Sequence, residues 1–300
     1  MKIFDCTTYF DEPMLFEIRL NILDKHVDEF IVAEALYTHS GKRKKINFNK
    51  NLYPRFKNRI THIIIENEPS NIIPTKDNNI NQSNHSTYRL NAAKRIEFQR
   101  NALAKIFSIK NNEDWIIYSD SDEIPNLHNI NFYQIKKKYV LFKQKIFYYK
   151  FNLSLPGVNW YGSKACQYKN LTTISELRNI KPKKYSWWRF DTFFKKNKFI
   201  NLKIVEDGGW HFTEIKTPKE IYTKHINDEH HDEFDQTGIN EEHIKDMIKN
   251  RYIPYDHNID QREWEKKWNK NNRIKLSIVE SSKLPKYLIA NKQKYSSWFD

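Results

Sequence analysis

Cysteine is scarce in this sequence, which contains two, Cys6 and Cys166, in 300 residues. They lie far apart and have no metal-ligand spacing, so they exclude a disulfide framework and a cysteine zinc site. Neither lies in a pattern typical of a nucleophile, and we interpret both as buried structural thiols. The cysteine content therefore fits a reducing compartment.

Long hydrophobic runs are missing as well. No stretch approaches the ~20 apolar residues that span a bilayer, and residues 1–13 contain no apolar core typical of a signal peptide. We therefore expect a cytoplasmic protein without a signal peptide or transmembrane segment.

Aromatic residues are abundant instead. They make up 15% of the sequence, against a modest 39% for all hydrophobic residues. Each aromatic ring buries a large area, so the sequence predicts a core built on rings. This composition excludes intrinsic disorder, which is poor in aromatic residues.

Positive charge is in excess, with a formal net charge of +14. It raises the local concentration of anionic partners such as a phosphorylated small molecule, nucleic acid or an anionic membrane, and it allows peripheral contact with such a membrane. The basic residues are scattered, with short clusters at 41–45, 135–139 and 181–185. Such clusters form either a solvated surface or a surface that faces an anion, and both interpretations stay open.

The first half alternates strand and helix patterns. We expect strands at 27–35, 59–66 and 114–120, a helix after Pro13 with Leu15, Ile18 and Ile22 on one side, and a long helix at 86–110. This alternation predicts an α/β fold with a mainly parallel, twisted sheet flanked by helices.

The second half is aromatic and ends in helical patterns. Residues 139–153 predict one long aromatic strand, and the segments after Thr217 predict helices. No internal repeat and no linker rich in Gly, Pro or Ser interrupts the chain. We therefore expect a single domain, 1–300, with a nucleotide-binding half (1–138) and an aromatic, C-terminally helical half (139–300).

An apolar run ends in carboxylates in "WIIYSDSDEIP", from Trp115 to Pro125. Ligands bind at the carboxyl ends of parallel strands, where Asp120, Asp122 and Glu123 are expected. Two carboxylates at i and i+2 face the same way and suit Mg²⁺ or Mn²⁺, which in turn binds a diphosphate. The alternative is an acidic turn in which Asp122 or Glu123 caps a helix beginning near Pro125.

A second cluster is "VEDGGWHF", residues 205–212, which holds two of the six glycines. Adjacent glycines allow close approach of the backbone to a ligand. His211 is a candidate metal ligand together with Asp122, or a structural histidine. Glu206 and Asp207 are candidates for a general base.

These motifs resemble a known family. The segments "FDCTTYFDEP", "RIEFQRNAL", "YSDSDEIP", "WYGSKACQYKNL", "SELRNI" and "GGWHF" occur in an order similar to glycosyltransferase family 17, the family of β-1,4-mannosyl-glycoprotein β-1,4-N-acetylglucosaminyltransferase. The resemblance covers most of the chain. It implies a GT-A-like fold, an inverting reaction dependent on Mn²⁺ or Mg²⁺, a nucleotide-sugar donor such as UDP-GlcNAc, and a glycan or glycolipid acceptor.

The resemblance also implies roles for particular residues. Asp120, Asp122 and His211 would bind the metal, with Glu123 in the same acidic turn. Contacts to the donor would come from Glu34, Arg100, Arg178 and Asp120. "HHDEF" matches a His-x-Glu motif through His231 and Glu233.

The assignments of the base and of the acceptor site rest on chemical reasoning and not on the family resemblance. Asp207 is the first candidate for the base and Glu233 the second, because a carboxylate can deprotonate an acceptor hydroxyl. Trp160, Trp187 and Trp188 are candidates for stacking on the acceptor sugar, or belong to an aromatic core.

Two other functions compete with the transferase. A metal-dependent phosphohydrolase also uses a D-x-D motif after a strand. A basic nucleic-acid-binding protein would account for the charge and the aromatic residues, but it leaves the acidic strand end unexplained, so we expect no specific nucleic acid partner.

Overall fold

The computed structural model describes residues 1–74, 85–105, 111–182, 201–227, 231–259 and 264–300. The first elements are β1 (Ile3–Thr8), α1 (Pro13–Leu23), β2 (Glu29–Ala35), β3 (Ile60–Ile65), α2 (His85–Ala102) and β4 (Trp115–Ser119). The middle elements are β5 (Glu123–Pro125), β6 (Tyr139–Phe142), β7 (Lys145–Tyr148), β8 (Leu153–Ser154), β9 (Lys164–Gln167), α3 (Ile174–Asn179), β10 (Leu202–Val205) and β11 (Gly209–Thr213). The last are α4 (Pro218–His225), α5 (His231–Thr237), α6 (Glu241–Lys249), β12 (Tyr252–Ile253), α7 (Trp264–Lys267), β13 (Ile274–Lys275), β14 (Ser277–Ile278) and α8 (Lys286–Ala290).

The main sheet has the strand order β10-β6-β9-β4-β1-β2-β3. Strands β4, β1, β2 and β3 are parallel to their neighbours in this group, and β10 is parallel to β6. Strand β9 runs antiparallel to both β4 and β6. The expected α/β fold with a mainly parallel sheet is therefore confirmed.

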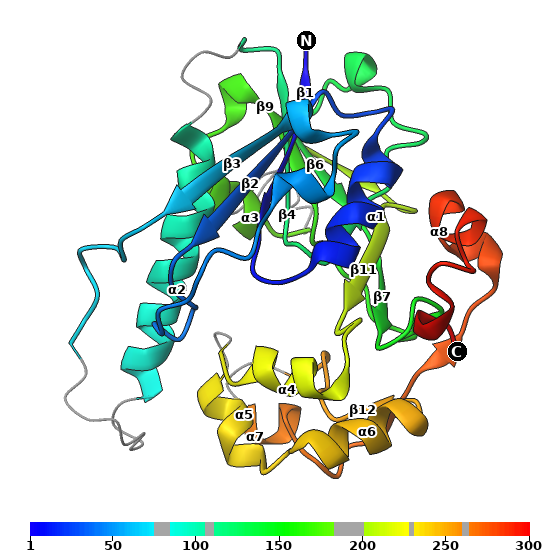
Figure 1. Cartoon of the computed structure of the whole chain (residues 1–300). Coiled ribbons are helices and arrows are strands. Elements are labelled where there is room, and N and C mark those ends of the chain that lie inside the picture. The colour runs from blue at the N-terminus through cyan, green and yellow to red at the C-terminus, as the bar shows by residue number, and fades with distance from the viewer. Residues whose placement is uncertain (75–84, 106–110, 183–200, 228–230, 260–263) are drawn as a thin grey trace, which may run out of the picture.

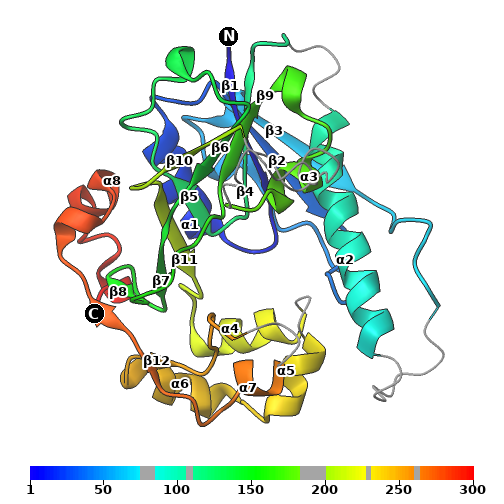
Figure 2. The same ribbon diagram turned by 180° about the vertical axis from the view of Figure 1, so that it is seen from behind.

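Helices cover both faces of this sheet. Helix α1 lies on one face in Figure 1, and α2 and α3 lie on the opposite face in Figure 2. The side chains of β2 alternate accordingly, with Phe30 and Val32 in the cluster with α1 and Ile31 and Ala33 in the cluster with α3. A strand buried on both faces explains the unbroken apolar run of residues 30–33 within β2.

The expected long strand at 139–153 is wrong. The chain forms β6 in the main sheet and then β7 in a second sheet, whose order is β14-β8-β7-β11-β5. The break falls at Gln144, whose buried side-chain amide donates to Ser163 Oγ at 2.9 Å and accepts from Ser163 N at 3.2 Å. This polar anchor lies between the two strands, and the chain changes sheets there.

Helices α4 to α7 form a separate layer below the sheets (Figure 1). Their core includes Ile221, Phe234, Ile244 and Met247, which pack with the second-sheet residues Ile146 and Tyr148. Strand β11 connects this layer to the sheets, because it ends a few residues before α4 begins.

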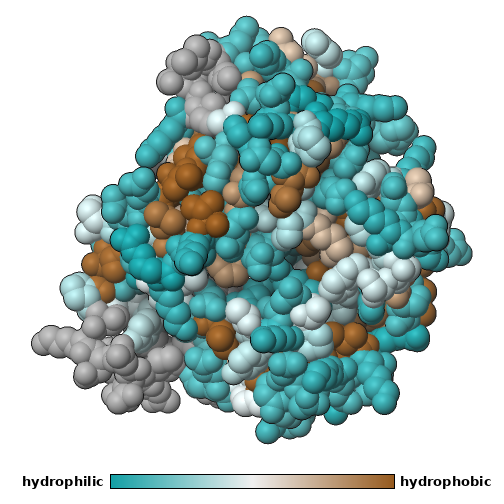
Figure 3. Space-filling model, in the orientation of Figure 1, coloured by the Kyte–Doolittle hydropathy of each residue, from teal (hydrophilic) through white to brown (hydrophobic). Residues whose placement is uncertain are grey.

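The face of the molecule in Figure 3 is mainly hydrophilic, with hydrophobic side chains in separate patches. Among the described residues, no helix has the length and apolar character needed to cross a membrane.

Candidate functional site

The main cavity, here called the first cavity, has a volume of about 320 Å³. It lies at the carboxyl ends of three parallel strands, because residues 8–10, 37–39 and 120–123 line it and follow β1, β2 and β4. Ligands of parallel sheets bind at this edge. The acidic strand end therefore lines a cavity, and the binding of a ligand there stays a prediction.

Arg19 of α1 holds the acidic turn in place from inside the core. It is fully buried, and its guanidinium donates to both oxygens of Asp5 at 2.6 Å. The same guanidinium donates to the backbone carbonyl of Glu123 at 2.6 Å. Burial opposes the charge on Arg19, but the Asp5 carboxylate outweighs it and raises the pKa of Arg19. The turn that carries the D-x-D motif is therefore fixed by a buried ion pair.

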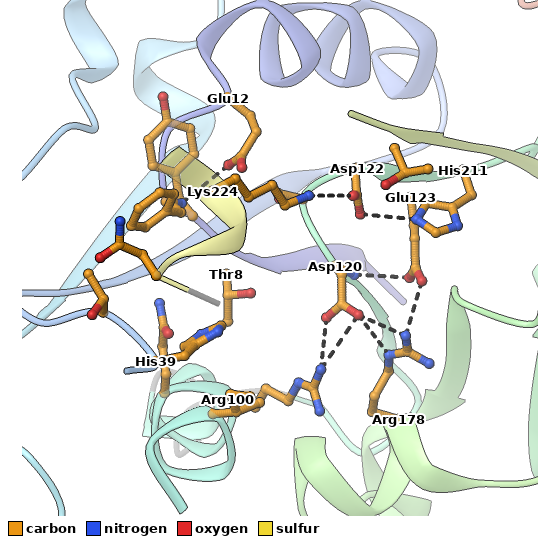
Figure 4. Close-up of a pocket in the computed structure, with 18 of the residues that line it drawn as sticks. Thr8, Glu12, His39, Arg100, Asp120, Asp122, Glu123, Arg178, His211 and Lys224 are labelled. Atoms are coloured by element: carbon orange, nitrogen blue, oxygen red, sulfur yellow. Dashed lines mark hydrogen bonds and ion pairs between the residues drawn. The ribbon is translucent and has the colours of Figure 1, made fainter. Parts of the chain in front are cut away.

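Asp120 lies between two arginines (Figure 4). Arg178 donates to Asp120 Oδ2 at 2.7 Å, and Arg100 donates to Asp120 Oδ1 at 3.2 Å. The Tyr118 hydroxyl donates to Oδ1 at 2.7 Å. Burial alone would raise the pKa of Asp120, but the guanidiniums of Arg178 and Arg100 hold it well below its usual value. Asp120 thus orients the two arginines toward the cavity.

Glu123 is buried and forms the floor of the same cluster. Its Oε1 accepts from Trp160 Nε1 at 2.6 Å and from Arg178 at 3.1 Å. Gly162 is required beside it, because a Cβ at that position would overlap the Glu123 carboxylate. Trp160 stacks on His211, with ring centroids 4.8 Å apart, so this tryptophan belongs to the cavity wall.

Asp122 lies between Lys224 and His211 (Figure 4). Lys224 Nζ is 3.4 Å from Asp122 Oδ2, and His211 Nε2 is 3.5 Å from Asp122 Oδ1. Burial opposes the ionisation of Asp122, but Lys224 and His211 outweigh it and lower the pKa to about 2. The carboxylate is therefore charged at neutral pH.

The formal charges of the first cavity cancel. Four cationic side chains line it, and so do four carboxylates; they are Lys44, Arg100, Arg178 and Lys224, and Glu12, Asp120, Asp122 and Glu123. A diphosphate entering the cavity would bring uncompensated negative charge. A divalent cation that enters with the diphosphate would supply the missing positive charge.

The residues present fit such an ion in part. No three His, Cys, Asp or Glu side chains of the described ranges come together as a metal cage. Asp122 and His211 offer one oxygen and one nitrogen that face each other, and His211 Nδ1 has no hydrogen-bond partner within the described ranges. Mg²⁺ and similar ions commonly use one or two protein ligands and take the rest from phosphate and water. Asp122 and His211 fit this pattern, whereas the arginines engage both oxygens of Asp120.

Lys164 contacts the backbone at the end of α3, where Arg178 lies. It is buried, and its Nζ donates to the backbone carbonyls of Arg178 and of Ile180, the latter at 2.7 Å. Burial first, and then repulsion from Arg178, lower the pKa of Lys164 to about 7. Lys164 therefore fixes the end of α3 without adding a full charge to the cluster.

Several expected site residues lie elsewhere. Glu34 is buried outside the cavity lining and binds Lys44, Asn47 N at 2.8 Å and Phe48 N at 3.0 Å. It holds the segment that carries Lys44, which does line the cavity. Its contact with a donor stays a prediction.

The candidate base Asp207 lies on an exposed turn between β10 and β11 and does not line the first cavity. The geometry thus gives this assignment no support. Glu233 lies in α5, but its side chain is outside the described part, as are Trp187 and Trp188. The alternative of a helix beginning near Pro125 is wrong, because residues 123–125 form β5, paired with β11.

Sequence reasoning missed Glu12, Lys44 and Lys224 in the cavity wall. Glu12 directly precedes α1, and its Oε2 accepts from Phe10 N and Asp11 N at 3.3 and 3.1 Å. Its position after the first parallel strand was a usable signal. Lys224 had none, because only the tertiary fold brings α4 to Asp122.

Comparisons with known proteins bear on the whole chain. The family model of glycosyltransferase family 17 matches residues 1–299. None of the curated proteins matches. Among solved structures, the chain is similar to HddC from Yersinia pseudotuberculosis at 10% identity, with 70% of this chain and 91% of that chain covered and a TM-score of 0.32.

Two further structures are similar to parts of the chain. HddC complexed with GMP-PN matches at 11% identity over 69% of this chain and 91% of that chain, with a TM-score of 0.30. CTP:phosphocholine cytidylyltransferase (LicC) from Streptococcus pneumoniae matches at 7% identity over 56% and 68%, with a TM-score of 0.20.

Proposed function

Because the chain belongs to glycosyltransferase family 17, we propose that it is an inverting, metal-dependent transferase that uses a nucleotide-diphosphate sugar. UDP-GlcNAc is the first donor to test, and the acceptor is a hydroxyl of a glycan or glycolipid. The observation that carries this proposal is the position of Asp122 between Lys224 and His211, in a cavity that two arginines also line.

The chain's own cations would bind the diphosphate. Arg100 and Arg178 are held by Asp120, so their planes are fixed before a ligand arrives. A preoriented guanidinium binds phosphate oxygens at little cost in side-chain entropy. Lys224 adds a third cation, beside Asp122.

Asp122 and His211 would hold a divalent cation, Mn²⁺ or Mg²⁺. When bound, such an ion stabilises the charge that develops on the leaving diphosphate. The ionised state of Asp122 at neutral pH, with its pKa near 2, suits this role.

The rings of Tyr9, Phe10 and Tyr37 line the cavity after β1 and β2. We assign the nucleoside to these rings, because they lie on other strand ends than the D-x-D turn. A flat base stacks favourably on aromatic side chains.

A thermal-shift experiment tests the proposal. UDP, GDP and CDP are each added with Mn²⁺, with Mg²⁺ or with EDTA. A ligand at about 100 times its Kd stabilises the fold by ~2.7 kcal/mol. We expect UDP with Mn²⁺ to raise the Tm by about 5 °C, and we expect Asp122→Asn to remove that rise. Glu113→Gln is the matched control, since Glu113 is exposed and pairs with Lys169 outside the cavity.

Two results would contradict the proposal. If no nucleoside diphosphate raises the Tm with Mn²⁺ or Mg²⁺, the proposal fails. Release of inorganic phosphate from p-nitrophenyl phosphate would instead indicate a phosphohydrolase.

A further inference from the structure

A second cavity of about 150 Å³ adjoins the first. His211, Thr213 and Lys224 line both cavities, so the two share one wall. The volume corresponds to about five water molecules at ~30 Å³ each. It therefore takes one ring-sized group, which would lie next to a phosphate bound at Lys224.

The lining of the second cavity contains both aromatic and aliphatic side chains and carries few charges. Tyr148, Tyr255 and Trp268 line it, and the rings of Tyr255 and Trp268 are 4.8 Å apart. The Tyr148 hydroxyl is 2.8 Å from His257 Nε2. Burial lowers the pKa of His257 to about 4, so this imidazole is neutral at pH 7. Rings together with neutral hydrogen-bonding groups suit a neutral sugar better than a charged ligand.

Among the described residues, Glu214 is the carboxylate that lines this cavity. It follows directly after β11, and its Oε1 lies 2.9 Å from His225 Nε2. The ring of His225 stacks on Phe234 with centroids 4.6 Å apart and planes at 14°. The imidazole is thus fixed from one face, and it holds the carboxylate in a defined position.

The backbone at this point is strained. Glu214 has a φ of 57° and Tyr149 a φ of 64°, in the left-handed region that non-glycine residues rarely adopt. They follow the neighbouring parallel strands β11 and β7, in which Thr213 pairs with Tyr148, and both line the second cavity. Such strain persists only where the surrounding structure fixes it, and it is concentrated at ligand sites.

We propose that the second cavity binds a neutral sugar acceptor and that Glu214 is the general base, with His225 as its positioning residue. The inference rests on the proposed function. The Glu214 carboxylate takes the proton of the acceptor hydroxyl, whose oxygen forms the bond to the anomeric carbon of the donor. The bond from that carbon to the diphosphate oxygen breaks, and the nucleoside diphosphate leaves with the electron pair.

The other cavity carboxylates are less suited to this step. Cations engage both Asp120 and Asp122, and Glu123 accepts from Trp160 and Arg178. Glu12 lines the first cavity and not the second. A hydroxyl on a ring in the second cavity therefore meets Glu214 first.

The test compares Glu214→Gln with wild type in the presence of UDP-GlcNAc and Mn²⁺. The acceptors are the p-nitrophenyl glycosides of mannose, glucose, galactose and GlcNAc, and UDP release is measured. Azide is the second nucleophile, because the azide anion attacks the anomeric carbon without losing a proton. We expect transfer to the glycosides to fall about 10²–10⁴-fold, while azide still releases UDP and forms a glycosyl azide of inverted configuration.

Each of the other outcomes contradicts one part of the proposal. Transfer by Glu214→Gln near the wild-type rate, or loss of the azide reaction together with transfer, overturns the assignment of the base. Azide turnover by wild type without transfer to any glycoside overturns the neutral sugar acceptor. If wild type neither binds UDP nor releases it, the proposed function fails, and the base assignment fails with it. Glu113→Gln serves as the control for the substitution itself, since Glu113 is exposed and lies outside both cavities.

Discussion

The two cavities share a wall but differ in the number of charged side chains that line them. In the first, cationic side chains and carboxylates are equal in number, and ion pairs join several of them, such as Asp120 with Arg178. In the second, Glu214 and Lys224 are the charged side chains among the described lining residues, besides the histidines, and aromatic and aliphatic side chains make up most of the wall. The difference matches the two halves of a transfer reaction, in which one substrate carries a diphosphate and the other a neutral hydroxyl.

Asp122→Asn is expected to have the largest effect. It removes the negative charge that pairs with Lys224 and His211, and with it the proposed ion site in the first cavity. We expect UDP release from UDP-GlcNAc to fall on the order of 10³-fold. Measured in steady state with Mn²⁺, a rate within tenfold of wild type would show that the charged cavity does not use this carboxylate.

Arg19→Met tests what holds the charged cavity together. It leaves Asp5 buried and unpaired and frees the carbonyl of Glu123. We expect the free energy of unfolding to drop by about 3–5 kcal/mol, since one partner of a buried pair is lost. The measurement is urea unfolding followed by circular dichroism.

The matched control for that variant is Arg55→Met. Arg55 pairs with Asp24, but its side chain is 65% exposed. An exposed pair contributes at most about 1 kcal/mol. Equal losses in the two variants would contradict the role given to Arg19.

Lys164→Met tests the charge state of the buried Lys164 through the pH dependence of the free energy of unfolding. The folded state lowers the pKa of Lys164 from 10.5 to about 7, so above pH 7 the unfolded chain binds a proton that the folded chain does not. Stability of wild type relative to the variant should therefore rise with pH, on the order of 1 kcal/mol between pH 7 and 8. Urea unfolding of both proteins at several pH values measures this, and parallel curves would contradict it.

Tyr255→Leu should have the smallest effect, and it is confined to the second cavity. The change keeps an apolar side chain but removes a ring that the acceptor sugar would contact. We expect the acceptor KM to rise about 2- to 10-fold, equivalent to ~0.5–1.5 kcal/mol of ring contact, with the Kd for UDP unchanged. Tyr133→Leu is the control, because Tyr133 is 80% exposed and lines neither cavity. An altered Kd for UDP in Tyr255→Leu would remove the distinction between the cavities.

The first cavity was largely predictable from the sequence because its residues follow strands. Apolar runs located β2, β3 and β4, and the carboxyl end of β4 then carried Asp120 and Asp122 to the ligand edge. The pairing of Asp120 with two arginines and of Asp122 with Lys224 was not predictable. It joins residues 58 positions apart in the case of Asp120 and Arg178, and no local pattern specifies that contact.

The second cavity could not have been found this way. Its lining comes from β7, β11, α4 and the C-terminal segments, from Tyr148 to Trp268. The prediction of a single strand at 139–153 did not allow for this cavity. The break at Gln144 depends on a side-chain contact with Ser163, which the local sequence does not specify. Asp207 was favoured as a base from local composition, whereas Glu214 is distinguished by its backbone conformation and its contact with His225.

The basic clusters of the sequence also differ in their surroundings. Lys44, in the cluster at 41–45, pairs with buried Glu34 and lines the first cavity. The lysines at 136–138 are exposed to solvent. Only the tertiary fold distinguishes a cation that lines the cavity from cations that face water.

Calorimetric titration of UDP into the protein, with Mn²⁺ and again in EDTA, tests the central claim most directly. The account predicts one UDP per chain, bound at least about tenfold more weakly in EDTA, which corresponds to ~1.4 kcal/mol. Equal affinity in the two buffers, or no binding in either, would contradict it.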